Sequence, residues 1–369
     1  VELLIGAKAS VTQCSNCLFS ALHRAAYVGN SAAARVLIDN KADVNMTENN
    51  EWTPLHWAAT YGHGSIVDDL IEAKADVNLH DRSLSTPLHA ALGGLYEVLQ
   101  SLLVAKALVD ARDSDNKTPL HYAARASSVA GVQALLDAKA LVDVAGGWRN
   151  EAPSHCAAEA GRSAALQLLV DAKASPERKD DNESTPLHRA AQRGHTAAMQ
   201  VLIDANAPIN AADVEGLTSL HHAAWDGHIA AVRVLINAKA DLDGTAHRST
   251  AAWAYATRSG HSAIVKVLID AKASMNIQDG VGRTALHVAA EHGEVDVLRL
   301  LLDANATINI EDDHGADVLQ HAANSGQTEA LQMLLDFTHK DFQLDEIDHD
   351  SLEYTYALHE KSRYQRSGE

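Results

Sequence analysis

The amino-acid sequence predicts an all-α fold, a curved α-solenoid of stacked repeats that each contain two short helices. Three observations predict it. A four-residue motif related to Thr-Pro-Leu-His recurs, and its fourth position falls at residues 23, 56, 89, 121, 155, 188, 221, 254, 287 and 320. The spacing stays between 32 and 34 residues, so the copies keep one register along the chain. Each copy precedes apolar segments with helical periodicity that are too short to be stable alone, so each repeat must bury its apolar side against a neighbour.

The second repeat shows how each element follows from its residues. Thr53 can cap a helix N-terminus, and Pro54 suits the first helical position, where a missing N–H costs nothing. Paired alanines make this first helix thin enough for close packing, and Gly62 ends it. Apolar residues with helical spacing over residues 66–71 predict the second helix. The polar segment that starts at residues 75–78 predicts a β-hairpin-like finger leading into the next repeat.

The period of about 33 residues and the motif Thr-Pro-Leu-His-x-Ala-Ala, complete at residues 53–59, resemble the ankyrin repeat. The resemblance covers residues 1–336, as a half repeat at 1–9 followed by about ten repeats. It implies a stack of helix-turn-helix repeats with projecting fingers and a concave face that binds other proteins. Residues 337–369 form an acidic C-terminal tail, for which we expect a capping helix or a linker.

One position departs from the family pattern. The resemblance implies glycine after the second helix, in the left-handed conformation that glycine tolerates best. This chain instead has Lys8, Lys41, Lys74, Lys106, Lys139, Lys173, Asn206, Lys239, Lys272 and Asn305. A β-carbon there costs about 1 kcal/mol per site. We interpret the lysines as a sequence preference inherited within the lineage, without a function of its own. The alternative is a functional stripe of lysines.

Composition limits the classes of function. The formal charge of −19 argues against a nucleic-acid partner, since phosphate binding depends on Lys and Arg. The sequence has no apolar run long enough for membrane insertion. Three cysteines in 369 residues indicate a reducing, cytoplasmic compartment. Cys14 and Cys17 form a Cys-x-x-Cys pair without a second pair of zinc ligands, so we expect neither metal nor cofactor.

Twenty-one histidines suggest metal or acid–base chemistry, but their placement indicates a structural role. Eight occupy the fourth motif position: His23, His56, His89, His121, His155, His188, His221 and His287. The resemblance implies that each imidazole bonds the Thr or Ser of its own repeat and nearby backbone. We interpret His222 and His321 as variants of the same arrangement. Because no catalytic motif is present, we expect no enzyme.

Partner recognition should use positions that the repeat leaves free, namely the finger tips and the two residues after the paired alanines. Aromatic residues concentrate there, and such anchors dominate interface energies. The predicted partner-binding residues are Phe19, Tyr27, Asn49, Asn50, Trp52, Tyr61, Trp148, Arg149 and Trp225. We expect Phe19, Tyr27, Trp52 and Tyr61 to form one apolar patch on the concave side. We assign Trp57, Tyr122, Trp253 and Tyr255 to the core.

The sequence therefore predicts a non-catalytic protein-interaction module, an adaptor or scaffold, with a partner of basic or mixed-charge surface. One alternative is a regulatory or targeting domain of a larger enzyme or channel. Another is a structural subunit of a large complex. The resemblance also implies candidate sites for asparagine hydroxylation at the base of the fingers: Asn45, Asn78, Asn210, Asn276 and Asn309.

Overall fold

The computed structural model describes residues 18–91, 96–244 and 251–341. Within these ranges the chain forms helices and no β-strand, with one isolated antiparallel bridge between Gly146 and Glu151. The chain divides into an N-terminal unit, residues 1–186 with 204–207, and a C-terminal unit, residues 187–203 with 208–369. The fingers are turns closed by backbone hydrogen bonds such as that from the N–H of Asp81 to the carbonyl of Ser85, at 2.9 Å.

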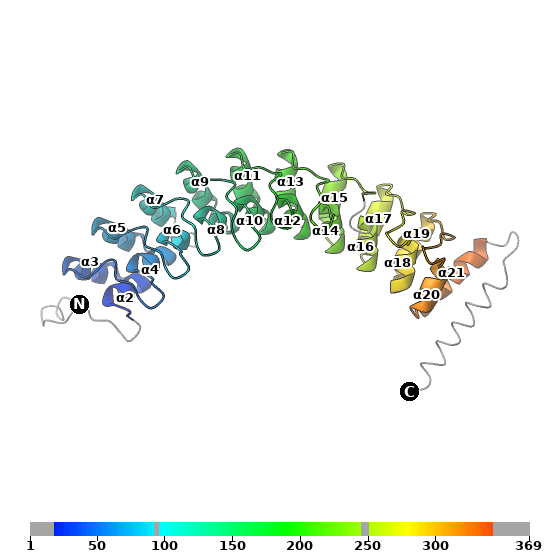
Figure 1. The fold of residues 1–369 in the computed structure, drawn as a ribbon, viewed down its shortest axis with the longest axis horizontal. Helices are drawn as coiled ribbons and strands as arrows, with labels where there is room; N and C mark the ends of the chain where they lie inside the picture. The colour runs from blue at the N-terminus through cyan, green and yellow to red at the C-terminus, as the bar shows by residue number, and fades with distance from the viewer. Residues whose placement is uncertain (1–17, 92–95, 245–250, 342–369) are drawn as a thin grey trace, which may run out of the picture. The chain divides into compact units, whose positions relative to one another are not determined.

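In the N-terminal unit, first and second helices alternate along the chain and lie in two rows (Figure 1). The first helices are α2 (Ala21–Val28), α4 (Pro54–Thr60), α6 (Pro87–Ala90), α8 (Pro119–Arg125) and α10 (Pro153–Glu159). The second helices are α3 (Ser31–Asp39), α5 (Gly64–Glu72), α7 (Tyr96–Val104), α9 (Val129–Asp137) and α11 (Ser163–Asp171). First helices pack on first helices and second helices on second helices of the adjacent repeat, as in the pairs α2–α4 and α3–α5.

The C-terminal unit continues the same alternation. Its first helices are α12 (Pro186–Gln192), which starts one residue before the boundary, α14 (Ser219–Trp225), α16 (Ala252–Arg258), α18 (Ala285–His292) and α20 (Val318–Asn324). Its second helices are α13 (Thr196–Asp204), α15 (Ile229–Asn237), α17 (Ser262–Asp270), α19 (Val295–Asp303) and α21 (Thr328–Asp341). Helix α21 has 14 residues and extends past residue 336, where the repeat pattern in the sequence stops.

The core forms from the residues that the motif predicts. In the second repeat, Leu55, Ala58 and Ala59 of α4 and Ile66 and Leu70 of α5 are fully buried. The two alanines let α4 pack closely between α2 and α6. Burial of each leucine or isoleucine side chain contributes about 1.5–3 kcal/mol, gained only because the neighbouring repeat covers it.

The motif histidines join neighbouring repeats. The N–H of Thr53 donates to Nδ1 of His56 at 3.1 Å, so Nε2 carries the proton and donates to the carbonyl of Ser85, also at 3.1 Å. Equivalent Nε2 contacts to the following finger, at 2.9–3.2 Å, are made by His23, His56, His89, His121, His155 and His188. Burial lowers the pKa of His56 to about 4, which keeps the imidazole neutral. The predicted structural role is confirmed for these histidines.

The residue after each second helix adopts the left-handed conformation that the glycine position predicts. The φ angles lie between 65° and 72° at Lys41, Lys74, Lys106, Lys139, Lys173, Lys239 and Lys272, and are 61° and 59° at Asn206 and Asn305. Lys8 lies outside the described residues. The lysine side chains are exposed, so the repeat accepts backbone strain here without any buried contact that explains it.

The asparagines at the base of the fingers form a second link between repeats. The amide oxygen of Asn45 accepts the backbone N–H of Asp76 at 2.8 Å, and that of Asn78 accepts the N–H of Leu108 at 2.8 Å. Asp110 accepts the N–H of Leu141 in the same way at 2.9 Å, because a carboxylate oxygen can replace the amide oxygen as acceptor.

Candidate functional site: an aromatic face of first helices and fingers

Four of the predicted binding residues surround one tryptophan in the N-terminal unit. The ring centroid of Trp57 lies 5.6 Å from that of Phe19, 5.3 Å from Tyr27, 4.7 Å from Trp52 and 6.1 Å from Tyr61. Tyr27 also contacts Tyr61 directly, edge to face, at 5.0 Å. We call these five residues the aromatic cluster. Its edge-to-face and stacked arrangements are the favoured geometries of aromatic pairs.

Helix packing and caps position the cluster. Tyr27 lies near the end of α2, whereas Trp57 and Tyr61 are four residues apart at α4 and its C-cap and so share one side of that helix. Trp52 is fixed by the finger of the next repeat, since its indole N–H donates to Oδ2 of Asp81 at 2.8 Å. The rings are therefore held by two helices and a finger before any partner arrives.

The cluster is accessible. Tyr61 is 50% exposed and Tyr27 36%, and the other three rings are partly exposed. The assignment of Trp57 to the core was wrong, because its ring is only half-buried at the centre of this surface. Tyr122, also assigned to the core, is 36% exposed, whereas Trp253 is fully buried as predicted. Tyr255 is half-buried.

The remaining predicted residues lie elsewhere. Asn49 and Asn50 are exposed on the finger before Trp52 and make no ring contact. Trp148 is 77% exposed on the finger of the fifth repeat, and the guanidinium of Arg149 lies 3.9 Å from its ring centroid. Trp225, in the C-terminal unit, is 47% exposed and stacks on Tyr255 at 5.1 Å.

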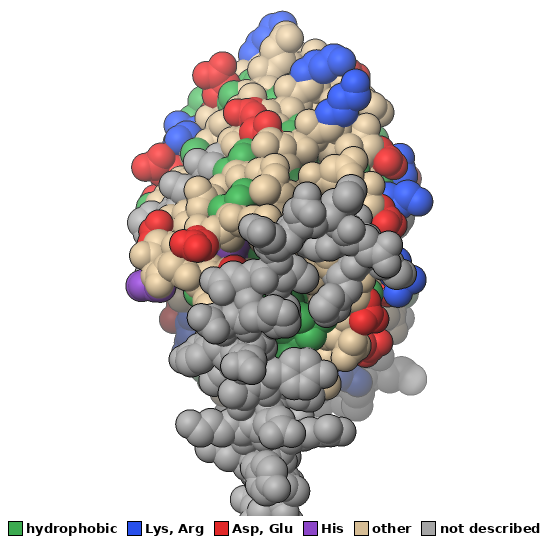
Figure 2. Space-filling view, turned by 90° about the vertical axis from the view of Figure 1, so that its right-hand side faces the viewer, with side chains coloured by type: hydrophobic (Ala, Val, Ile, Leu, Met, Phe, Trp, Pro, Cys, Tyr) green, Lys and Arg blue, Asp and Glu red, His purple; other side chains and the backbone are tan. Residues whose placement is uncertain are grey.

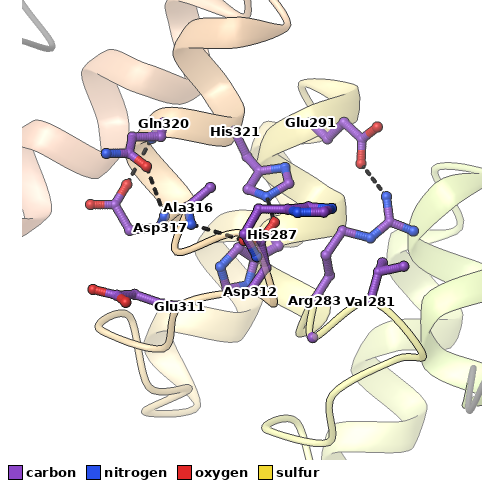
Figure 3. A network of polar contacts seen from close by, with 12 residues as sticks. Val281, Arg283, His287, Glu291, Glu311, Asp312, Ala316, Asp317, Gln320 and His321 are labelled. Atoms are coloured by element: carbon purple, nitrogen blue, oxygen red, sulfur yellow. Dashed lines mark hydrogen bonds and ion pairs between the residues drawn. The ribbon is translucent and has the colours of Figure 1, made fainter.

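Sequence reasoning missed a set of finger carboxylates. Oδ1 of Asp312 accepts the N–H groups of His314 and Ala316, and Oδ2 lies 2.9 Å from Nε2 of His321 (Figure 3). Burial alone would raise the pKa of Asp312, but these donors hold it at about 2. The signal was present in the sequence as an acidic residue eight positions before seven of the ten fourth motif positions.

The same carboxylates show that two histidines do not belong to the motif set. His222 lies 2.8 Å from Oδ2 of Asp213, as His321 does from Asp312, and the hydroxyl of Tyr122 donates to Asp113 in the same way. The interpretation of His222 and His321 as variants of the motif histidine was therefore wrong. They stand one residue further along the helix, where a side chain reaches the finger of its own repeat.

One of the three cysteines lies within the described residues. Cys14 and Cys17 lie outside them. Cys156 is a buried free thiol, and burial raises its pKa to about 12. Over residues 18–91, 96–244 and 251–341, no three His, Cys, Asp or Glu side chains are placed to hold a metal ion. Among the helices of these ranges, none combines the length and apolar character needed to cross a bilayer.

Charges on the surface are mixed. Figure 2 shows Asp and Glu side chains interspersed with Lys and Arg over the described surface that it presents. The ion pairs include Arg35 with Asp69 at 2.6 Å and Arg283 with Glu291 at 2.7 Å. The acidic excess of the chain is thus not gathered on that face into a patch of one sign.

Comparison with known proteins gives a consistent result. The family described as ankyrin repeats (3 copies) matches residues 1–81, 75–145, 154–246 and 251–348. A similar solved structure is the ankyrin repeat domain of Bcl-3, a member of the IkappaB protein family, with 25% sequence identity and a TM-score of 0.54. The match covers 60% of this chain and 99% of that domain. No curated protein matches. The motif, the paired helices and the family match together place this chain in the ankyrin repeat family.

Proposed function

We propose that this chain is a non-catalytic adaptor or scaffold that binds a protein partner on the face formed by its first helices and fingers, with the aromatic cluster as the anchor. Ankyrin repeats are in general protein-interaction modules. The observation that carries the proposal is the exposure of Tyr27 and Tyr61 beside Trp57 on rigid elements. Aromatic side chains held in place before binding lose little conformational entropy and act as energetic anchors.

Electrostatics supports a protein partner with a basic or mixed-charge surface. The chain carries a net charge of −19, which would accelerate encounter with a basic protein and repel nucleic acid. The cluster itself has one cation near it, since the guanidinium of Arg24 lies 5.5 Å from the ring centroid of Tyr27. The low cysteine content favours a cytoplasmic location.

The proposal is tested by removing the two most exposed rings. A partner is first identified by cross-linking mass spectrometry from native extract, and its affinity is then measured for the purified chain and for a Tyr27→Ala/Tyr61→Ala double variant. We expect a loss of about 30-fold or more, the range of an interface hot spot. The control is Tyr96→Ala, which removes an equally exposed tyrosine from the second helix α7. Equal affinity of the double variant and the parent chain would refute the proposal.

A further inference from the structure

The eighth repeat lacks the imidazole that joins its neighbours elsewhere. Ala254 stands at the fourth motif position, so no side chain there can donate to the following finger. In the six repeats whose motif histidine is His23, His56, His89, His121, His155 or His188, the finger carbonyl accepts two hydrogen bonds, one from the finger itself and one from Nε2 of that histidine. The corresponding carbonyl, that of Arg283, accepts the N–H of Asp279 at 2.8 Å and no other donor among the described residues.

A groove of about 600 Å³ lies over Ala254. Its apolar lining comes from Trp225 and Tyr255, which stack on each other, and from Val281 and Val288. The volume is within the range of sites that hold a ligand or a bound side chain. Ala254, at the position that an imidazole fills in most other repeats, is one of the residues that line the groove.

The charged groups that line the groove carry a small acidic excess. Three carboxylates, those of Glu215, Asp279 and Glu291, line it together with two guanidinium groups, those of Arg258 and Arg283, and with the imidazole of His292. The guanidinium of Arg283 already pairs with the carboxylate of Asp279, at 2.9 Å. It also pairs with that of Glu291, at 2.7 Å (Figure 3). Within the described part of the chain, the carboxylate of Glu215 forms no ion pair, and neither does the exposed Arg258 at the end of α16.

We propose that this groove binds an arginine side chain from an extended segment of a protein partner. A guanidinium is planar and can stack on the exposed indole of Trp225, as Arg149 stacks on Trp148 within this chain at 3.9 Å. Its N–H groups can donate to the carbonyl of Arg283, in place of the missing imidazole, and to the carboxylate of Glu215. A lysine offers neither the plane nor the fork of donors.

The inference rests on the proposed function, since it assumes a protein partner, but it concerns a different unit and shares no residue with the aromatic cluster. It is therefore tested without the partner. The purified, ¹⁵N-labelled chain is titrated with acetyl-arginine amide while the indole N–H signal of Trp225, assigned with a Trp225→Phe variant, is followed by NMR. We expect a saturable shift with a dissociation constant on the order of millimolar, as for a small ligand. Acetyl-citrulline amide, the neutral isostere, should produce none.

An Ala254→His variant gives the sharper test. The introduced imidazole should occupy the groove, bond the carbonyl of Arg283 as in the other repeats, and abolish the response to acetyl-arginine amide. Thermal unfolding at an unchanged or higher temperature would show that the loss is not caused by misfolding. The matched control, Gln320→His, restores histidine in the tenth repeat and should leave the response intact.

A second variant does not alter packing. Glu215→Gln removes an exposed carboxylate and should weaken binding about 3-fold, as expected for an exposed ion pair. A Trp225 signal that does not respond to acetyl-arginine amide, or that responds equally to the citrulline compound or in the Ala254→His variant, would overturn the inference. None of these outcomes bears on the Tyr27→Ala/Tyr61→Ala measurement, so the two proposals fail separately.

Discussion

The indole N–H of Trp52 donates to Oδ2 of Asp81 at 2.8 Å, and this bond ties the finger of the second repeat to that of the third. Asp81 is 7% exposed, and its other oxygen already holds the N–H groups of Ser83 and Ser85. The residue after the motif histidine is Ala90 in the third repeat, which cannot reach the carboxylate as Tyr122 does in the fourth. The preceding repeat supplies the donor instead.

Trp52→Phe should therefore destabilise the N-terminal unit. The substitution keeps most of the ring but leaves Oδ2 of Asp81 without its donor, which costs about 1–3 kcal/mol for a hydrogen bond to a charged group. Urea unfolding followed by circular dichroism measures the difference. Trp148→Phe, at a ring that is 77% exposed, is the control and should change stability by less than about 0.5 kcal/mol. Equal effects of the two substitutions would show that the Trp52 bond contributes nothing.

Acidification should weaken the array before any carboxylate is protonated. Burial lowers the pKa of His56 and of His188 to about 4, whereas unfolded histidine titrates near 6.5. Below pH 6.5 the unfolded chain therefore binds protons that the folded chain does not, so this stability is complete above pH 7 and is lost as the pH falls from 6.5 towards 4. Each of the two residues should contribute on the order of 2 kcal/mol between pH 7 and pH 5. Denaturant titrations at pH 7, 6 and 5 measure the effect.

The control for the pH prediction replaces a motif histidine with glutamine, the residue that the tenth repeat has at the same position. Gln320 stands at the motif position in the tenth repeat, where its Oε1 accepts the N–H of Asp317 at 3.3 Å. His56→Gln should keep this cap and remove one titrating group, so the stability of the variant should depend less on pH. An unchanged pH dependence would mean that His56 is not the source.

Replacing a lysine that adopts the left-handed backbone conformation with glycine should stabilise the protein. Lys106 has a φ of 65° and an exposed side chain, so Lys106→Gly removes the strain of the β-carbon and should add up to about 0.5 kcal/mol after the entropy cost of glycine. Lys106→Ala removes the charge but keeps the β-carbon and should give no gain. If both variants gained equally in thermal unfolding, charge rather than backbone strain would be the cause.

Hydrogen exchange should be fastest in the first helices of the third, fifth and eighth repeats. Helix α6 has four residues, so few of its amides are hydrogen-bonded within the helix. Helices α10 and α16 are complete, but their N-cap residues are Ala152 and Ala251, which have no side-chain oxygen to accept a backbone N–H as Thr53 does in the second repeat. The loss of a cap lowers the free energy of local opening. Uniform protection from α2 to α20 would contradict this expectation.

Much of the fold could be predicted from the sequence because one repeat specifies its own elements. Thr53 and Pro54 predict the start of α4, and the family resemblance implies the bonds of His56 with Thr53 of its own repeat. The left-handed Lys106 follows from the place of glycine in the family. Each of these depends on residues within one repeat or at a fixed offset from it, so the regular spacing carries the information.

The candidate site was less predictable because its contacts depend on how far side chains reach. Spacing alone placed Trp57 in the core, whereas in the structure it is only partly buried, at the centre of four other rings. Nothing in the pattern of the third repeat indicated that Asp81 would be bonded by Trp52 of the preceding one. The groove over Ala254 likewise becomes visible only when the neighbouring finger is in place.

The imidazole bridge gives the array a direction. The six motif histidines from His23 to His188 donate forwards to the following finger, as His56 does to the carbonyl of Ser85 and His155 to that of Ser184. Deleting repeats from the C-terminal end would take the carbonyl partner and the cover away from the histidine of the new last repeat, whereas deleting them from the N-terminal end would free only a carbonyl that keeps its bond within the finger. Shortened versions of this protein should therefore tolerate loss at the front better than loss at the back.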